Sequence, residues 1–241
     1  MVVLSNQSLF VGTPEDDVVS GTSSGDYLYG ELGNDTLRGL AGLDILRGSE
    51  GSDTLFGGTE SDGLDGLEGN DQVFGEAGAD NLHGGEGIDR LEGGDGNDII
   101  SGGGGADVLL GGAGADIFSY HDVRESRGSG TDQILDFEAQ DRLDLSSVEP
   151  GAAGFTFIGS AAFTAAGQIR AITDGGGTHV QINTGGDATP EMSIDLTNGV
   201  AFTAANLILS GNPNHDFGGD SVIVGDGGDL LLPVATVDTL V

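Results

Sequence analysis

The chain has 241 residues, including 47 glycines, and it carries a net charge of -33 from 40 acidic residues against seven arginines, with no lysine. That balance excludes nucleic acid and anionic membranes as partners, because both require a basic surface. The chain has no cysteine and hence no disulfides, and it has no apolar run long enough for a membrane span.

We expect residues 1–11 to form a short N-terminal lead before the repeats. Its start, Met1-Val-Val-Leu-Ser-Asn-Gln, lacks the basic region and the apolar core of a secretory signal peptide. So short a lead predicts no catalytic domain upstream of the repeats.

Residues 12–119 consist of twelve nonapeptides without insertion or deletion. Each has glycine at position one, aspartate at position six and an apolar residue at position eight, as Gly12, Asp17 and Val19 show in the first. This is the pattern of calcium-binding β-helix repeats. So much glycine disfavours helix, whereas the last three residues predict a short strand and the first six a turn. We predict an all-β fold, a parallel β-roll with two repeats per eighteen-residue coil.

Stacking at this period brings the carboxylates of residues eighteen apart together along two edges of the roll. Like charges that close are unfavourable without a cation between them, and calcium accepts irregular sets of carboxylate and carbonyl oxygens. Asp132 lies two residues before Ile134, the spacing found in the repeats, so it is expected to complete a last site beside Asp116. The predicted metal ligands are Asp17, Asp26, Asp35, Asp44, Asp53, Asp62, Asp71, Asp80, Asp89, Asp98, Asp107, Asp116 and Asp132.

The array resembles the repeats-in-toxin (RTX) family of secreted bacterial proteins, whose repeats form a calcium-filled parallel β-roll. The resemblance implies that two stacked turns share each ion, so twelve repeats offer ten turn pairs and up to about ten Ca²⁺ ions. Glu15, Ser24 and Glu60 replace the glycine at position four. We therefore expect the first two turns, and to a lesser degree the turn around Asp62, to bind calcium less well.

Residues 120–210 are predicted to form an antiparallel β cap over the open end of the solenoid. Alternating apolar residues predict strands at 131–138, 141–147, 155–158, 168–172, 179–183, 192–196 and 206–209, separated by glycine-rich turns. The stretches T-D-Q-I-L-D-F, D-R-L-D-L-S and T-G-G-D-A-T-P-E-M resemble the C-terminal domain of serralysin-type metalloproteases.

Residues 211–241 form the predicted tail. Its segment from Asn212 to Gly218 is interpreted as a linker, because Phe217 replaces the glycine that an EF-hand turn needs. In RTX proteins an uncleaved C-terminal signal addresses a type I exporter, and the ending Asp238-Thr-Leu-Val fits such a signal. The resemblance thus implies a secreted, extracellular protein with that exporter as a partner.

Known catalytic motifs give no support for an enzyme. Gly21-Thr-Ser-Ser-Gly25 matches the serine hydrolase motif but lies within a repeat, without the following helix that the nucleophile needs. The sequence has no H-E-x-x-H zinc motif, and its four histidines are scattered.

The preferred interpretation is a non-catalytic, secreted calcium-binding protein that folds on extracellular calcium. One alternative is the C-terminal module of an extracellular enzyme, either a serralysin-type protease or a mannuronan epimerase. Another is an adhesive or surface-layer module with a polysaccharide or surface partner. It would use Phe56 and Phe74, expected between Arg38 and Arg90, or Tyr27, Tyr29 and Arg47 on the other sheet, although chance decoration of the sheet explains these residues more simply.

Overall fold

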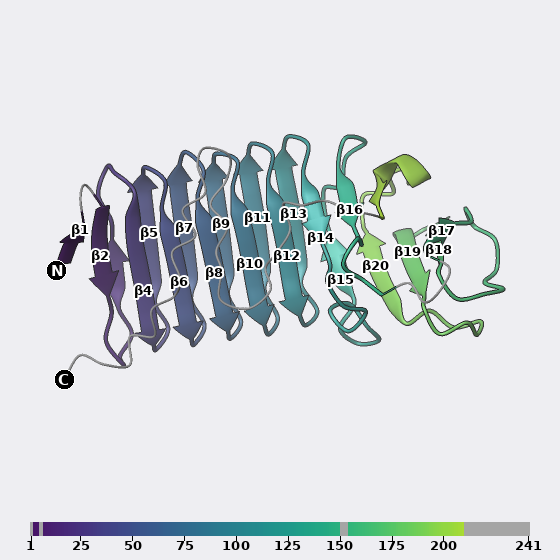
Figure 1. The fold of residues 1–241 in the computed structure, drawn as a ribbon, viewed down its shortest axis with the longest axis horizontal. Coiled ribbons are helices and arrows are strands. Elements are labelled where there is room, and N and C mark those ends of the chain that lie inside the picture. The colour runs from purple at the N-terminus through teal and green to yellow at the C-terminus, as the bar shows by residue number, and fades with distance from the viewer. Residues whose placement is uncertain (1, 5–6, 150–153, 210–241) are drawn as a thin grey trace.

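The computed structural model describes residues 2–4, 7–149 and 154–209 as two sheets that stack into an elongated roll (Figure 1). The first sheet contains, in spatial order, β1 (Val2–Leu4), β2 (Gln7–Val11), β4 (Asp26–Leu32), β6 (Ile45–Glu50), β8 (Gly63–Glu68), β10 (Asn81–Glu86), β12 (Ile99–Gly104), β14 (Ile117–Ser119), β16 (Arg142–Asp144) and β21 (Leu207–Ile208). The second contains β17 (Thr156–Phe157), β18 (Gln168–Asp174), β19 (Gly177–Asn183), β20 (Met192–Leu196), β15 (Asp132–Ile134), β13 (Val108–Ala113), β11 (Arg90–Asp95), β9 (Gln72–Ala77), β7 (Thr54–Thr59), β5 (Thr36–Ala41) and β3 (Val18–Ser20).

The predicted coil of eighteen residues is confirmed by the strand register. Leu37 pairs with Leu55 and Leu55 with Val73 in parallel rungs of one sheet, and Leu46 pairs with Leu64 in the other. Consecutive strands therefore alternate between the two sheets, and every side chain lies above its equivalent in the previous coil.

The strands are longer than the three residues predicted. β5 to β13 contain six residues each and run on into the first three residues of the next repeat. Glycine at position one sits within the strand: Arg38 pairs with Phe56 and Leu40 with Gly58, and the register passes over Gly39 between them. The turn is correspondingly tighter than six residues.

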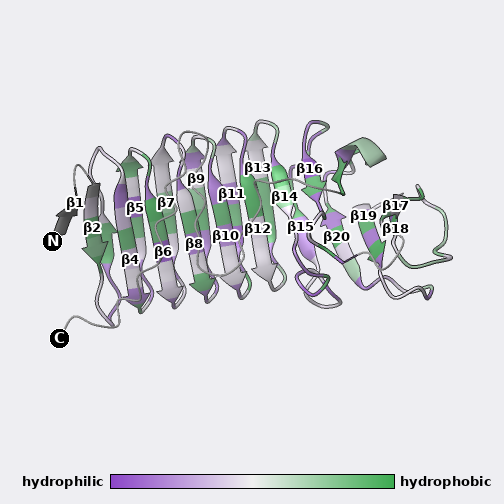
Figure 2. Cartoon of the chain, in the orientation of Figure 1, coloured by the Kyte–Doolittle hydropathy of each residue, from purple (hydrophilic) through white to green (hydrophobic). Residues whose placement is uncertain are grey.

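The apolar residues at position eight form the core of the roll. Side chains from Leu28 to Phe118 at this position have at most 2% of their surface exposed, whereas Val19, in the first coil, is partly buried. Hydrophobic and hydrophilic residues alternate along the strands in Figure 2. The core is one side chain wide on each sheet, so its area alone gives limited stabilisation for so glycine-rich a chain.

The expected N-terminal lead contributes to the roll. β2 pairs in parallel with β4, with Phe10 opposite Leu28, and β1 pairs antiparallel with β2. The first sheet therefore extends beyond the first glycine repeat.

The C-terminal segment continues both sheets and closes the roll. β15 and β16 add to β13 and β14 in parallel, and β20 adds to β15, again in parallel. The antiparallel hairpins predicted for this segment are confirmed for β18–β19 and β19–β20. Phe137, Ile182 and Ile194 belong to the same buried cluster as the roll core.

No helix in the described part of the chain is long and apolar enough to cross a membrane. The predicted linker at 212–218 and the predicted export signal lie outside the described residues.

Candidate metal centre

The predicted aspartates form two columns, one along each edge of the roll. In each column, one carboxylate oxygen, Oδ1, accepts a hydrogen bond from the backbone N–H of the aspartate eighteen residues earlier, at 2.6–2.9 Å, from Asp17→Asp35 through Asp98→Asp116. The columns predicted from the period are thus confirmed as geometry. Each aspartate ties two successive coils together.

The second carboxylate oxygen, Oδ2, has no hydrogen-bond partner in ten successive repeats. These ten aspartates have at most 3% of their surface exposed, so water does not solvate that oxygen. They are Asp35, Asp44, Asp53, Asp62, Asp71, Asp80, Asp89, Asp98, Asp107 and Asp116. A buried, unpaired carboxylate oxygen calls for a cation.

The glycine at position one leaves room beside each of these oxygens. A Cβ on Gly57 would lie 2.7 Å from Oδ2 of Asp62 and 2.8 Å from the carbonyl oxygen of Gly75. A Cβ on Gly75 would likewise lie 2.6 Å from Oδ2 of Asp80. A carboxylate oxygen of one coil and a carbonyl oxygen of the next therefore converge where any other residue would place its side chain.

This set of donors suits calcium and does not suit zinc. No group of three or more His, Cys, Asp or Glu side chains gathers around one point among the described residues. A cation in the turns would therefore be held by oxygens of the backbone together with few carboxylates, which is how calcium is bound in proteins. The residues present fit calcium.

Burial makes these carboxylates hard to ionise without a cation. It raises the pKa of Asp62 to about 8, and those of Asp80, Asp89 and Asp98 to about 7, although the N–H of the preceding aspartate opposes the shift. The neighbouring carboxylates of the column raise the pKa of Asp62 further.

Asp17 and Asp26, the first predicted ligand in each column, have different surroundings. Oδ2 of Asp17 accepts hydrogen bonds from the N–H and the hydroxyl of Thr13, at 2.6 and 2.9 Å. Oδ2 of Asp26 accepts the same two bonds from Thr22. Their second oxygens are thus already occupied.

Asp132 does not lie beside Asp116, as predicted, but extends the other column. Its Oδ1 accepts the N–H of Asp107 at 2.9 Å. The reason is the alternation of strands between sheets: Asp116 precedes β14 in one sheet, whereas Asp132 starts β15 in the other. Its Oδ2 is buried without a hydrogen-bond partner, as in the ten repeats before it.

Two further aspartates, which were not predicted, complete the C-terminal end. Asp141 accepts the N–H of Asp116 through Oδ1 and that of Glu138 through Oδ2. Asp136 accepts the N–H groups of Gly111 and Gly112, both at 2.9 Å. Asp141 lies two residues before Leu143, so the spacing used for Asp132 would have found it; Asp136 carries no such signal.

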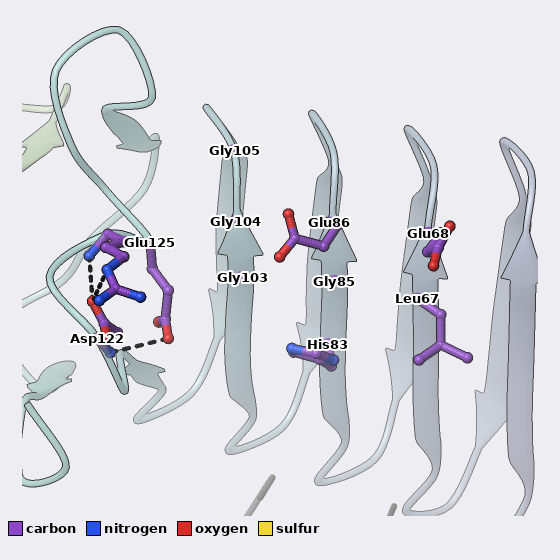
Figure 3. A pocket seen from close by; sticks show the side chains of 11 residues that line it. Leu67, Glu68, His83, Gly85, Glu86, Gly103, Gly104, Gly105, Asp122 and Glu125 are labelled. Carbon is purple, nitrogen blue, oxygen red and sulfur yellow. Dashed lines mark hydrogen bonds and ion pairs between the residues drawn. The ribbon is translucent and has the colours of Figure 1, made fainter. Parts of the chain in front are cut away.

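A surface pocket lies beside β8, β10 and β12 and is lined by Glu68, Glu86 and Glu125 (Figure 3). The two carboxylate oxygens of Glu125 accept the N–H groups of His121 and Asp122, at 3.0 and 3.1 Å. His83 in the same pocket bonds Asp65 through Nδ1 at 3.0 Å. These contacts fix the loop after β14 and the outer face of the sheet, which is a structural role.

The outward aromatic row differs in part from the prediction. Phe56 and Phe74 stack with centroids 5.1 Å apart, and Arg38 covers Phe56 at 5.1 Å. Glu92, not Arg90, pairs with Phe74, because Arg90 occupies position seven of its repeat. Both faces of the Phe56 ring are therefore covered within the chain, which leaves little for a sugar to stack on.

Two protein-family models match the chain. The family model described as Peptidase M10 serralysin C terminal matches residues 48–209, and the model of the RTX calcium-binding nonapeptide repeat (4 copies) matches residues 11–46. The chain belongs to the serralysin C-terminal family. Its RTX repeats make this family member a calcium-binding module built as a parallel β-roll.

Three solved structures are similar to this family member over part or most of its length. They are the solution structures of the AlgE6R2 subunit (29% identity, 59% of this chain and 89% of that one, TM-score 0.43) and the AlgE6R3 subunit (22%, 91% and 92%, 0.35) of the Azotobacter vinelandii mannuronan C5-epimerase, and the crystal structure of the extracellular lipase LipA from Serratia marcescens (16%, 87% and 41%, 0.27). Among curated proteins, none matches the chain.

Replacing Asp80 by Asn tests the role of the unpaired oxygen. Asparagine keeps the Oδ1 acceptor for the N–H of Asp62 but replaces the charged Oδ2 with a donor. In saturating calcium we expect the free energy of unfolding, measured by urea titration, to fall by about 1–3 kcal/mol. Asp95→Asn, on the exposed surface, is the matched control, and equal stability of the two variants would contradict the role.

Acidification should stabilise the calcium-free roll. The pKa values of these carboxylates are raised in the folded state, so their contribution to stability is fully present below the unfolded pKa of about 4. It is lost as the pH rises through the folded values of about 6 to 8. Circular dichroism of calcium-free protein should show more strand at pH 5 than at pH 8. The opposite trend would show that the carboxylates are not buried in the free chain.

Proposed function

We propose that the chain is a non-catalytic, secreted protein whose β-roll folds when its turns bind calcium. The observation that carries this proposal is the series of ten buried aspartates with an unpaired Oδ2, in register on both edges of the roll. The proposed ligands are these carboxylates together with carbonyl oxygens of the adjoining turns, such as that of Gly75 beside Asp62.

The residues of the chain have separate roles in this proposal. Oδ1 of each aspartate accepts the N–H of the previous coil, which orients Oδ2 of the same carboxylate toward the turn in the folded roll. Glycine at position one keeps the space beside Oδ2 open, and the apolar residue at position eight anchors the strand in the core. A bound calcium supplies the positive charge that neutralises facing carboxylates.

Magnitudes indicate that the free chain is unstable near neutral pH. Leaving a buried polar group unpaired costs about 1–3 kcal/mol, and more when the group is charged. Ten such groups cost on the order of 10–30 kcal/mol, whereas the net stability of a domain is only about 5–15 kcal/mol. Calcium affinity in the range of extracellular modules, about 10⁻⁴ to 10⁻³ M, would keep the chain unfolded at cytosolic calcium levels.

We further propose that the chain is divided into a roll at 12–119, a cap at 120–210 and a tail at 211–241. In this proposal the tail is recognised by a type I exporter. Support for the cap is its continuity with the roll: β15 and β16 continue both sheets, and their side chains join the same buried cluster. Support for export is the membership of the serralysin C-terminal family.

A second candidate function is that of a calcium-binding module attached to an extracellular enzyme. It is favoured by the family description itself, which names the C-terminal part of a peptidase. The two candidates share the calcium-binding turns. They differ in whether the roll is a protein of its own or part of an extracellular enzyme.

Calcium should convert the chain from disordered to β-structured. Far-ultraviolet circular dichroism of the full chain at pH 7.5, freed of calcium by dialysis, should show little strand. Strand content should appear cooperatively as calcium is titrated into the millimolar range, because each coil stabilises the next. Magnesium at the same concentration is the control, since it resists irregular coordination. Equal order with and without calcium would end the proposal.

The native protein should be found outside the cell. Mass spectrometry of the culture medium of the source organism should detect peptides of the roll. An intact mass of about 24.2 kDa would support the free secreted protein, and a larger mass would support the enzyme module. Confinement of these peptides to the cell pellet would contradict secretion.

A further inference from the structure

The turns of the first two repeats differ from the ten that follow at position two. In repeats three to twelve this position has a positive φ in every case. The residues are Glu31, Leu40, Ser49, Gly58, Leu67, Glu76, Gly85, Gly94, Gly103 and Gly112. Thr13 and Thr22 occupy the position in the first two repeats, and neither has a positive φ.

The difference follows from the covalent structure of threonine. A β-branched residue avoids positive φ because its two Cβ substituents clash with the backbone, whereas unbranched residues and glycine reach that region at lower cost. Threonine at position two therefore imposes another turn. In that turn its N–H and its hydroxyl both face the aspartate at position six.

These contacts satisfy the carboxylate completely at Asp26. Its Oδ2 accepts the N–H and the hydroxyl of Thr22, at 2.5 and 3.0 Å, and its Oδ1 accepts the N–H of Ser8 at 3.0 Å. Asp26 is as buried as the aspartates that follow it, with 1% of its surface exposed. Asp44, the next in the column, has the same burial but an Oδ2 without a partner.

At the C-terminal end, a protein donor satisfies the last carboxylate of one column only. Oδ2 of Asp141 accepts the N–H of Glu138, whereas Oδ2 of Asp132 is buried without a hydrogen-bond partner. The unpaired Oδ2 atoms thus begin at Asp35 and Asp44, and they end at Asp132 in one column and at Asp116 in the other.

We propose that Thr13 and Thr22 take the place of calcium in the two N-terminal turns. Their N–H and hydroxyl groups satisfy the aspartate carboxylate, so these turns need no ion. The inference rests on the proposed calcium binding and adds which turns take part. Threonine donors replace the cation at Asp17 and Asp26, so the first coil is held together before the inner turns are loaded. The residue at position two decides whether a turn binds calcium.

Exchanging the residue at position two should add or remove ions. The double variant Thr22→Gly with Ser24→Gly gives repeat two the sequence Gly-Gly-Ser-Gly-Gly-Asp, free to adopt the turn of the inner repeats. Ser24→Gly alone is its control. In the reverse direction, Glu76→Thr places a β-branched residue where φ is 73°, and Glu76→Gln is the control with the same charge change.

The readout is the number of calcium ions per chain, measured by native mass spectrometry and by equilibrium dialysis in saturating calcium. The double variant should bind at least one more ion than Ser24→Gly, and Glu76→Thr at least one fewer than Glu76→Gln. Equal numbers within the first pair, with a wild type that binds several ions, would overturn the role of threonine even if Glu76→Thr fails to fold. A wild type that binds none would overturn the proposed function as well.

Discussion

The fold depends on how the negative charge of the two aspartate columns is neutralised. Each of the ten buried aspartates from Asp35 to Asp116 uses one carboxylate oxygen to hold the preceding coil and leaves the other unpaired in the turn. The same residue is therefore both the link between coils and the source of their repulsion. Without a cation, the repeat that makes the roll regular also makes it unstable, because every coil after the first adds the same unpaired carboxylate oxygens.

Glycine has two structural functions in this arrangement. At position one it leaves the space beside Oδ2 open, as at Gly57 and Gly75. At position four it lets successive turns approach closely: a Cβ on Gly78 would clash with the carbonyl oxygen of Glu60, and one on Gly105 with that of Gly87. A chain with so much glycine loses much entropy on folding. In the proposed function, calcium binding supplies the free energy that the narrow core and the hydrogen-bond ladder lack.

Much of the fold follows from the period of nine residues, because a strict repeat fixes the register. The period predicts the alternation of sheets, the eighteen-residue coil and the burial of residues such as Leu82, all of which the structure contains. It does not predict how far a strand extends into the next repeat, since that depends on hydrogen bonds between coils. Asp132 was assigned to the wrong column because the longer loop at 120–131 hides the continued alternation of strands.

The sequence predicts that carboxylates line the candidate site, but it predicts less well which turns belong to that site. Aspartate at a fixed offset predicts where carboxylates stack, but the engagement of Asp26 by Thr22 depends on the φ angle of one residue. Glu15 and Ser24 at position four predict that the first two turns bind calcium less well. In the structure, it is the backbone φ at position two that distinguishes these two turns from the other ten.

X-ray diffraction from crystals grown in millimolar calcium, recorded where calcium scatters anomalously, tests the central claim most directly. Neutralisation by calcium predicts anomalous peaks along both edges of the roll, each next to Oδ2 of an aspartate between Asp35 and Asp116. Carboxylates that are instead bonded to water or to protein donors, with no anomalous density between successive turns, would contradict it.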